Sequence, residues 1–371
     1  MEFVNNGNWR FEHNKSKLTY RIDAETIDDR CFKYEETELF DNADNDFKKA
    51  ALVHKIVRNS VRGILKENTK IKDIVAHVED MVLKLYKRDR NTYFKQTTID
   101  GLAFPVGVSI NNVAAHDSAL LDDDRCLERG DVVKIDFGVH QNGHIIDSAF
   151  THVVGFDDSD SEYENLLEAS RDATYSAIAM SGPDTRLLEL SEVISEIISS
   201  YELPLDSYVK NKQIVPVEGL GGHDILPYRI HGDKLILSVP NQAQEGMKME
   251  EGEIYAIETY ASTGAGILSQ SGSADECSHF MLNPNVKSKR FFKKSDAYKG
   301  IKHRNGLPFT LQWCDTSYDK FVRDFKQAIL SNDILAYPPL VDEPHARISQ
   351  FEHTIRIRDG SVTIYSKGDD Y

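Results

Sequence analysis

A pattern of helices and strands that occurs twice constrains the fold of this chain more than any other feature of its sequence. Apolar residues recur every three or four positions over residues 46–86 and again over 161–201, which predicts a pair of amphipathic helices in each segment. A strand-rich stretch follows each pair, at 101–154 and at 214–261. This repeat of about 115 residues predicts an α+β fold in which two related halves face each other across a site.

The helices of the two repeats can be aligned position by position. A shift of 116 residues places apolar residues of one helix on apolar residues of the other: Ile71, Ile74, Val78, Met81 and Val82 fall on Leu187, Leu190, Ile194, Ile197 and Ile198. Any two amphipathic helices can be aligned in this way, so the match gains weight only from the strands that follow in the same order.

The two ends of the chain depart from the repeat. Residues 1–42 mix aromatic and charged side chains without clear periodicity, so we expect an irregular arm, to which we assign no function, followed by one domain over residues 43–371. Within that domain, residues 287–340 are basic, aromatic and helical in pattern, which indicates an insertion.

Net charge and cysteine usage narrow the class of protein. The chain has 60 acidic and 44 basic residues and a formal charge of −16, which opposes binding to nucleic acid or to an anionic membrane. Its four cysteines are scattered and show no CxxC spacing, so neither a zinc ribbon nor a disulfide framework is indicated. The sequence shows neither a secretory signal nor a membrane-spanning apolar run, so we expect a soluble cytoplasmic protein that acts as a monomer.

Two carboxylates on a predicted β-hairpin are the first sign of chemistry. Asn142-Gly143 between two apolar runs is typical of a two-residue hairpin loop. In that register Asp136 faces Ala149. Asp136 and Asp147 are then diagonal neighbours on the same face, with about 7–8 Å between their backbone positions. Two acids on an apolar face need a positive partner, which is either a metal ion or Lys134 of the same face. The second alternative would make the segment an ordinary salt-bridged hairpin.

Three further polar residues lie in surroundings that suggest a buried site. Glu258 and Glu352 each occur inside an apolar, β-rich run, where a carboxylate needs a partner. His223 follows Gly219-Leu220-Gly221-Gly222, and such glycines permit a close approach of the backbone. Histidine is a common metal ligand, although a single loop histidine is more often structural.

Short motifs spread along the chain give a more specific indication. They lie at Gly101–Pro105, Asn111–His116, Lys134–Gly138, Ile145–Phe150, Tyr228–His231, Ala256–Thr259 and Gln350–Thr354. Together and in this order, they resemble the motifs of type 2 methionine aminopeptidases over about residues 45–371, including the Gly-Asp-Asp-Tyr terminus. The resemblance implies the pita-bread fold, with two pseudo-symmetric halves around a central antiparallel sheet, and identifies residues 287–340 as the helical insertion of type 2 enzymes.

The resemblance also implies a function and a metal site. The function is the removal of the initiator methionine from the amino terminus of nascent polypeptides, with two divalent metal ions (Mn, Fe(II), Co or Zn) that activate water. Five residues match the family's metal ligands: Asp136, Asp147, His223, Glu258 and Glu352. Among them Asp136 is expected to chelate one ion, whereas Asp147 and Glu352 are expected to bridge both.

Roles for the remaining site residues follow from the same resemblance. His116 and His231 match the two catalytic histidines, which would bind the substrate amide and the tetrahedral intermediate, and Glu258 would serve as both ligand and proton shuttle. The methionine side chain is expected in a pocket whose residues could otherwise be ordinary core: Phe104, Ile230, His279 and Tyr337.

Three departures from the family pattern bear on activity, and two rival functions stay open. Asp117 replaces an aromatic residue, Asp224 replaces a small polar residue beside His223, and Leu226-Pro227 precedes Tyr228. The rivals are a non-enzymatic relative that binds ribosomes or other proteins, and a proline dipeptidase. Because all five matching ligands are present, we expect peptide or nascent-chain amino termini as the partners and leave association with the ribosome open.

Overall fold

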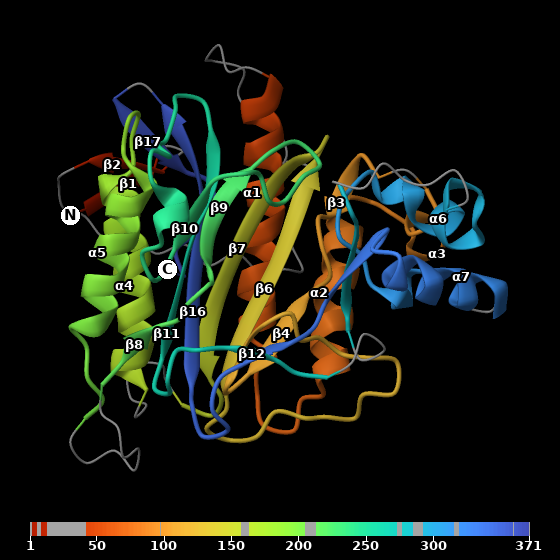
Figure 1. Cartoon of the computed structure of the whole chain (residues 1–371), viewed down its shortest axis with the longest axis horizontal. Coiled ribbons are helices and arrows are strands. Elements are labelled where there is room, and N and C mark those ends of the chain that lie inside the picture. The colour runs from red at the N-terminus through yellow and green to blue at the C-terminus, as the bar shows by residue number, and fades with distance from the viewer. Residues whose placement is uncertain are drawn as a thin grey trace.

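The fold is a set of long central strands flanked by helices, as Figure 1 shows. The computed structural model describes residues 2–5, 9–12, 42–96, 98–156, 163–204, 213–272, 277–284, 292–314, 319–358 and 360–370. Among these residues, no helix is both long and apolar enough to cross a membrane.

The first half of the repeat forms a four-stranded antiparallel sheet covered by helices. Its strands are β3 (Asp100–Leu102), β4 (Gly107–Ile110), β6 (Val132–Gln141) and β7 (His144–Val153). Its helices are α1 (Asn42–Arg62), α2 (Ile71–Leu85) and the short α3 (Arg90–Tyr93). β6 and β7 pair in the predicted register, with Asp136 opposite Ala149 and Gly138 opposite Asp147. The hairpin prediction is therefore confirmed.

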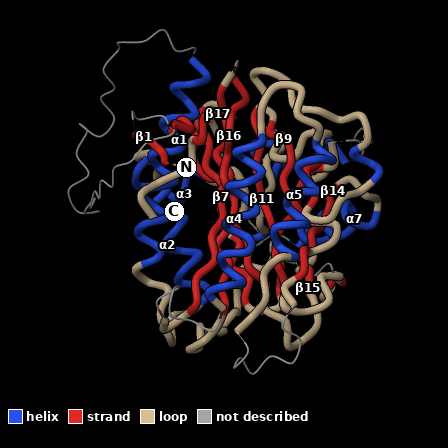
Figure 2. The backbone as a smooth tube through the Cα atoms, turned by 90° about the vertical axis from the view of Figure 1, so that its left-hand side faces the viewer, coloured by secondary structure: helices blue, strands red, loops and turns tan. Residues whose placement is uncertain are grey.

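The second half repeats this arrangement. Its sheet contains β8 (Val215–Pro216), β9 (Gly221–Ile225), β10 (Leu235–Leu237), β11 (Ile254–Ser262), β16 (Ile348–Arg358) and β17 (Ser361–Ile364). The helices α4 (Glu164–Met180) and α5 (Leu187–Ser199) cover it, and Figure 2 shows them in front of the strands. A second hydrophobic core lies under this helix pair, separate from the core of the first half.

The positions aligned by the sequence repeat are the buried positions of α2 and α5. Eight of the ten aligned residues have no exposed surface: Ile71, Ile74, Val78, Val82, Leu187, Leu190, Ile194 and Ile198. The other two, Met81 and Ile197, are partly buried at the margins of the two cores. The prediction of two related halves is confirmed.

The two sheets join where β7 meets β16, and side-chain hydroxyls make the connection. The Thr354 hydroxyl donates to the carbonyl of Asp147 (2.6 Å) and accepts from its backbone N–H (2.7 Å). Thr151 forms the same pair of bonds with the backbone of Gln350, at 2.8 Å each. These hydroxyl bonds satisfy the backbone N–H and carbonyl groups of Asp147 and Gln350, where the two strands lie together without a regular ladder.

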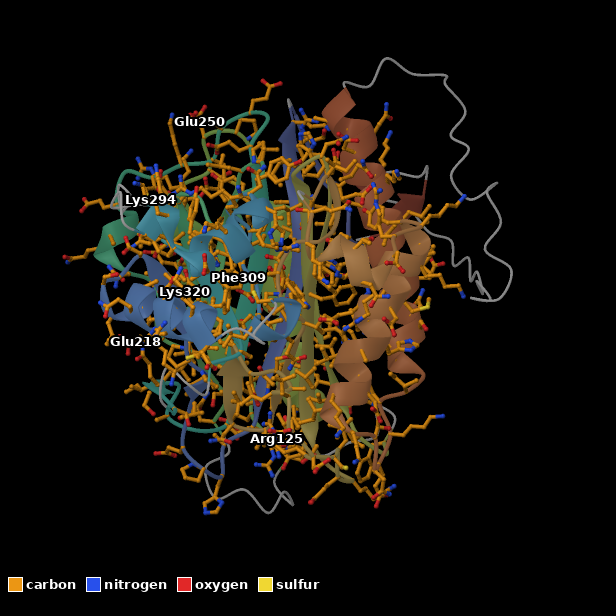
Figure 3. The ribbon with its side chains drawn as sticks, turned by 90° about the vertical axis from the view of Figure 1, so that its right-hand side faces the viewer. Arg125, Glu218, Glu250, Lys294, Phe309 and Lys320 are labelled. Atoms are coloured by element: carbon orange, nitrogen blue, oxygen red, sulfur yellow. The ribbon has the colours of Figure 1, made fainter. Side chains whose placement is uncertain are left out.

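The segment between β11 and β16 contains residues 287–340, which the sequence predicts to be an insertion. It includes α6 (Asp296–Ile301), α7 (Asp319–Leu330) and two small sheets: β13 (His279–Leu282) with β14 (Ile334–Tyr337), and β12 (Ser269–Gln270) with β15 (Leu340–Val341) and β5 (Val113–Ala115) of the first half. Phe309 is buried there against the rings of Phe280 and Phe325, while Lys294 and Lys320 lie at the surface (Figure 3).

The amino-terminal arm differs from expectation. The sequence predicts an irregular arm over residues 1–42, yet β1 (Glu2–Asn5) and β2 (Trp9–Glu12) pair with each other, and β2 continues the sheet beside β17. Short strands of mixed composition give little periodic signal, so a local pattern does not reveal a strand that is held by a distant sheet edge. Residues 13–41 of the predicted arm lie outside the described residues.

Candidate metal centre

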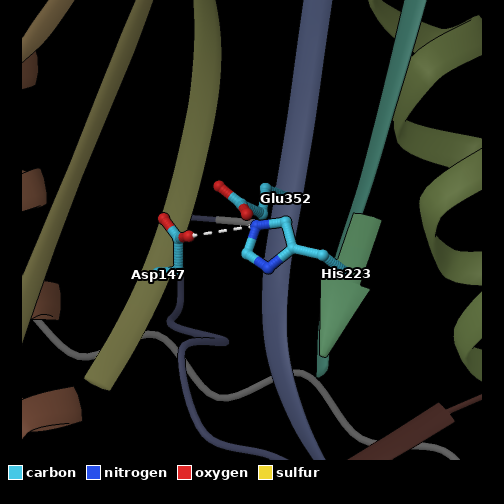
Figure 4. Close-up of side chains that lie close together, drawn as sticks. All are labelled: Asp147, His223 and Glu352. Atoms are coloured by element: carbon cyan, nitrogen blue, oxygen red, sulfur yellow. Dashed lines mark ion pairs between the residues drawn. The ribbon is translucent and has the colours of Figure 1, made fainter. Parts of the chain in front are cut away.

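All five residues that match metal ligands lie together at the junction of the two sheets. Asp147, His223 and Glu352 offer ligand atoms within 4.8 Å of one another, and so do Asp136, Glu258 and Glu352. Figure 4 shows the first group, in which His223 Nε2 lies 3.7 Å from Asp147 Oδ2. Glu352 belongs to both groups, whereas Asp147, also expected to bridge, belongs to one.

The strand pairing explains this convergence. Glu258 on β11 lies directly opposite Glu352 on β16, so both carboxylates leave the sheet on one face. His223 enters on β9, whose Gly222 lies so close to β11 that a Cβ there would be 2.3 Å from the Ala256 carbonyl oxygen. Glycine at position 222 is what allows β9 to bring His223 to the cluster.

A Gly222→Ala substitution tests this close approach. Because the added methyl group meets backbone rather than a movable side chain, we expect β9 to shift and the protein to lose about 1–3 kcal/mol of unfolding free energy, together with bound metal. Gly182→Ala is the control, since its Cβ meets nothing closer than 3.8 Å. Denaturant unfolding and metal analysis of both variants give the answer, and equal behaviour of the two would contradict the role of Gly222.

The carboxylates of the cluster are buried close to one another, which disfavours their charged forms. Burial raises the pKa of Asp136 to about 6, and burial together with the charge of Asp136 raises the pKa of Glu258 to about 8. Burial, followed by the charges of the neighbouring carboxylates, raises the pKa of Asp147 and Glu352 well above their ordinary values. The cluster therefore needs a positive group.

Lys134 does not supply that charge. Its ammonium group donates to the carbonyl oxygens of Asn111 (2.8 Å) and Val132 (3.4 Å), and among the described residues it forms no ion pair with a cluster carboxylate. By contrast, one buried oxygen each of Asp136, Asp147 and Glu352 lacks a hydrogen-bond partner in the described part of the chain. Four carboxylates, three of which have an unsatisfied oxygen, and one imidazole fit divalent metal ions, so the salt-bridged hairpin is not the arrangement found here.

Two neighbours of the cluster were not predicted as site residues. The Gln350 side-chain amide donates to Glu258 Oε1 (2.6 Å) and to Asp136 Oδ2 (3.0 Å), and the Tyr260 hydroxyl also donates to Glu258 Oε1 (2.7 Å). Each lies two positions from a ligand on its own strand, hence on the same face as that ligand. This two-residue spacing from a predicted ligand is the sequence signal that could have identified Gln350 and Tyr260 as site residues.

A cavity opens beside the cluster and contains the two predicted histidines. His116 and His231 both line it, together with Asp136, Asp147 and Glu258. His116 has a left-handed backbone (φ 67°), which is uncommon for a non-glycine residue. Burial lowers the pKa of His116 to about 4, and burial with the nearby His223 and His116 lowers the pKa of His231 strongly. Both imidazoles are therefore neutral at pH 7.

The four residues expected to hold a methionine side chain line the same cavity. They are Phe104, Ile230, His279 and Tyr337, and the unpredicted Met281 and Leu220 accompany them. The wall is continuous with the histidines, because the ring of Tyr337 lies 5.4 Å and that of His279 lies 6.0 Å from the ring of His116. The cavity thus joins an apolar wall to the polar cluster.

The two acidic departures have partners of their own. Asp117 is held by the Arg125 guanidinium at 2.7 and 3.1 Å, and Arg125 lies at the lower edge of the molecule in Figure 3. The Asp224 carboxylate accepts the backbone N–H of Lys234 at 2.7 Å. The charge of Asp117 is therefore paired with a cation, whereas the Asp224 carboxylate is held by a hydrogen bond from the backbone.

The comparison with protein families agrees with the fold and with the geometry of the site. Residues 45–288 match the model of metallopeptidase family M24. The chain belongs to this family, and the activity of its members implies divalent metal ions. The family predicted from the sequence motifs is confirmed.

Two similar relatives are both named methionine aminopeptidase 2. Methionine aminopeptidase 2 of Komagataella phaffii is 38% identical over 334 residues, which cover 88% of this chain and 70% of the relative. The enzyme of the same name from Kluyveromyces lactis is 36% identical over an alignment of 375 positions, which covers 98% of this chain and 84% of the relative.

Solved structures share the fold at lower identity. A thermophilic Arx1 superimposes with a TM-score of 0.70 at 18% identity, over 88% of this chain and 91% of the other. Methionine aminopeptidase from Thermotoga maritima gives a TM-score of 0.56 at 19% identity, over 86% of this chain and 94% of the other. The predicted pita-bread fold is confirmed.

Proposed function

We propose that this chain is a methionyl aminopeptidase that removes amino-terminal methionine from polypeptides with the help of two divalent metal ions. The observation that carries the proposal is the pair of ligand groups sharing Glu352 beside a cavity with an apolar wall. The relatives named methionine aminopeptidase 2 favour this activity over a proline dipeptidase or a non-enzymatic relative.

Five side chains would hold the metal ions. Asp147, His223 and Glu352 form one ligand group, and Asp136, Glu258 and Glu352 form the other. Such ions would lower the pKa of a water molecule and neutralise charge that develops on the scissile carbonyl group. Gln350 fixes the orientation of Asp136 and Glu258 by donating to both.

The other residues of the cavity would bind the substrate and move protons. Glu258 Oε1 accepts from Gln350 and Tyr260, which leaves Oε2 to take a proton from the attacking water and pass it to the leaving amine. The neutral imidazoles of His116 and His231 can donate hydrogen bonds to the substrate amide and to the developing oxyanion.

The apolar wall would select the first residue of the substrate. Phe104, Ile230, His279 and Tyr337 offer aromatic and aliphatic surface, and a methionine thioether makes favourable contacts with aromatic rings. Cytoplasmic location and a monomeric state remain predictions, and association with the ribosome stays open.

The proposal is tested with a panel of peptides and the metal-loaded protein. We expect free methionine from Met-Ala-Ser, none from the same peptide with an acetylated amino group, and no cleavage of an Ala-Pro dipeptide. Cleavage of Ala-Pro without release of methionine would replace the aminopeptidase by a proline dipeptidase. Failure to cleave any peptide by a folded, metal-loaded protein would contradict both activities.

Metal binding is expected to release protons. Since the pKa of Glu258 is raised to about 8, its carboxyl group carries a proton at pH 7 in the metal-free protein and must lose it to become a ligand. We expect at least about one proton released per chain at pH 7, and fewer as the pH rises past the pKa of Glu258. Calorimetric titration with Mn²⁺ in two buffers of different ionisation enthalpy measures this number, and a heat independent of the buffer would contradict the prediction.

A further inference from the structure

The loop that carries His231 is held at its base and, further along, by the Tyr228 N–H, which donates to the Gly143 carbonyl (3.0 Å), and by the buried side chain of Ile230. It connects β9 to β10 over residues 226–234 and presents His231 to the cavity, where its ring centroid lies 4.0 Å from that of His223. Residues 229–234 belong to no helix or strand. The place of the His231 imidazole therefore depends on the contacts that fix this loop.

Asp224 makes the contacts at the base of the loop. Its carboxylate Oδ1 accepts the N–H of Lys234 (2.7 Å), its own N–H donates to the Lys234 carbonyl (3.1 Å), and its carbonyl accepts the N–H of Gly232 (2.8 Å). Gly232 directly follows His231 in the chain. The side chain of Asp224 is buried and leaves β9 on the face opposite to that of His223, because neighbouring residues of a strand alternate.

The space at Gly232 is filled by this carboxylate. A Cβ at position 232 would lie 1.9 Å from Asp224 Oδ2 and 2.2 Å from its Cγ. The backbone of Gly232 does not adopt a positive φ, so its conformation alone does not require glycine. Any side chain at position 232 would push the carboxylate away from Lys234, and the loop would have to move with it.

We propose that Asp224 is a positioning residue, whose carboxylate occupies the space left by Gly232 and so determines where His231 stands in the cavity. This inference rests on the proposed aminopeptidase function. The family that the sequence resembles has a small polar residue at the position of Asp224. The carboxylate contact is therefore a feature of this chain rather than of the family pattern. The contact needs an acceptor oxygen of the right reach rather than a negative charge.

The first experiment measures Asp224→Ala and Asp224→Asn with Met-Ala-Ser as substrate. Loss of a residue that orients a site residue typically costs about 10–100-fold in activity. We expect that loss in kcat/KM for Asp224→Ala, mainly in kcat, with the metal content per chain unchanged. Asp224→Asn keeps an acceptor oxygen and should recover at least about half of the wild-type value.

Two double-mutant cycles separate positioning from general damage. In a His231→Ala background, Asp224→Ala should cause no further loss, because the residue it positions is already absent. Gly232→Ala alone should lower activity and the unfolding temperature. Combined with Asp224→Ala it should have little further effect, because the carboxylate that the new methyl group would meet is then absent. The unfolding temperatures of the metal-stripped proteins give this second cycle a readout that does not depend on catalysis.

The outcomes distinguish the possible failures. Wild-type kcat/KM in Asp224→Ala, effects that add to those of His231→Ala, or additive effects with Gly232→Ala would each overturn the inference. Loss of bound metal in Asp224→Ala would overturn it as well, since the residue would then act through His223. An inactive wild type overturns this inference and the proposed function together, whereas an active wild type with an unaffected Asp224→Ala overturns the inference alone.

Discussion

Replacing Glu352 by Gln is expected to abolish methionine release and to lower the metal bound per chain. Glu352 is the residue shared by both ligand groups, and its side chain is almost fully buried. A carboxamide of the same shape lacks the negative charge that a ligand shared by two divalent ions would supply. If the metal ions supply several kcal/mol of transition-state stabilisation, kcat/KM should fall by at least about 10³-fold.

The same variant should keep its fold. The pKa of Glu352 is raised in the folded protein by burial and by the other carboxylates, so in the metal-free protein its ionisation opposes folding once the pH exceeds the unfolded-state pKa. Glu352→Gln removes this cost, and the metal-stripped variant should unfold at or above the wild-type temperature at pH 7. The exposed Glu343→Gln is the control. Activity in Glu352→Gln near that of Glu343→Gln would contradict the shared role of Glu352.

Removing the carboxylate of Asp370 is expected to have the largest effect on stability. The fully buried Arg58 of α1 donates to both oxygens of Asp370 at 2.6 Å and to the carbonyl of Ser366 at 2.9 Å, which joins the first helix to the carboxyl-terminal segment. Breaking one side of a buried ion pair costs about 3–5 kcal/mol. We expect a loss of this size in Asp370→Ala.

The pH dependence of this ion pair has a definite sign. Burial raises the pKa of Asp370, but the charges of Arg58 and Arg62 outweigh that effect and hold its pKa below the ordinary value. Its contribution is therefore present at neutral pH and is lost as the pH falls through the range below about 4. Urea unfolding at pH 7 compares Asp370→Ala with the exposed control Asp369→Ala, and equal stability of the two would contradict the prediction.

The local sequence pattern predicts those parts of the fold that short-range periodicity controls. The apolar positions of α2 and α5 and the register of β6 with β7 follow from residues within one element or one hairpin. The pairing of β2 with β17 and the hydroxyl bonds between β7 and β16 do not, because they depend on partners hundreds of residues away.

The same distinction between local and long-range information applies to the residues of the candidate site. The hairpin alone placed Asp136 near Asp147, but nothing local connects these residues to His223, Glu258 and Glu352, and only the resemblance of several motifs brought them into one set. The orientation of Asp224 was open at the level of sequence, since a strand residue next to a ligand tells nothing about the loop that folds back onto it.

The central claim, that this cluster holds metal ions for methionine release, is tested most directly by titrating metal-stripped protein with Mn²⁺ or Co²⁺ while following methionine release from Met-Ala-Ser. We predict no release without metal, and activity that rises with added metal and saturates near two bound ions per chain. Release by the metal-free protein, or none by folded protein with either metal, would contradict the account.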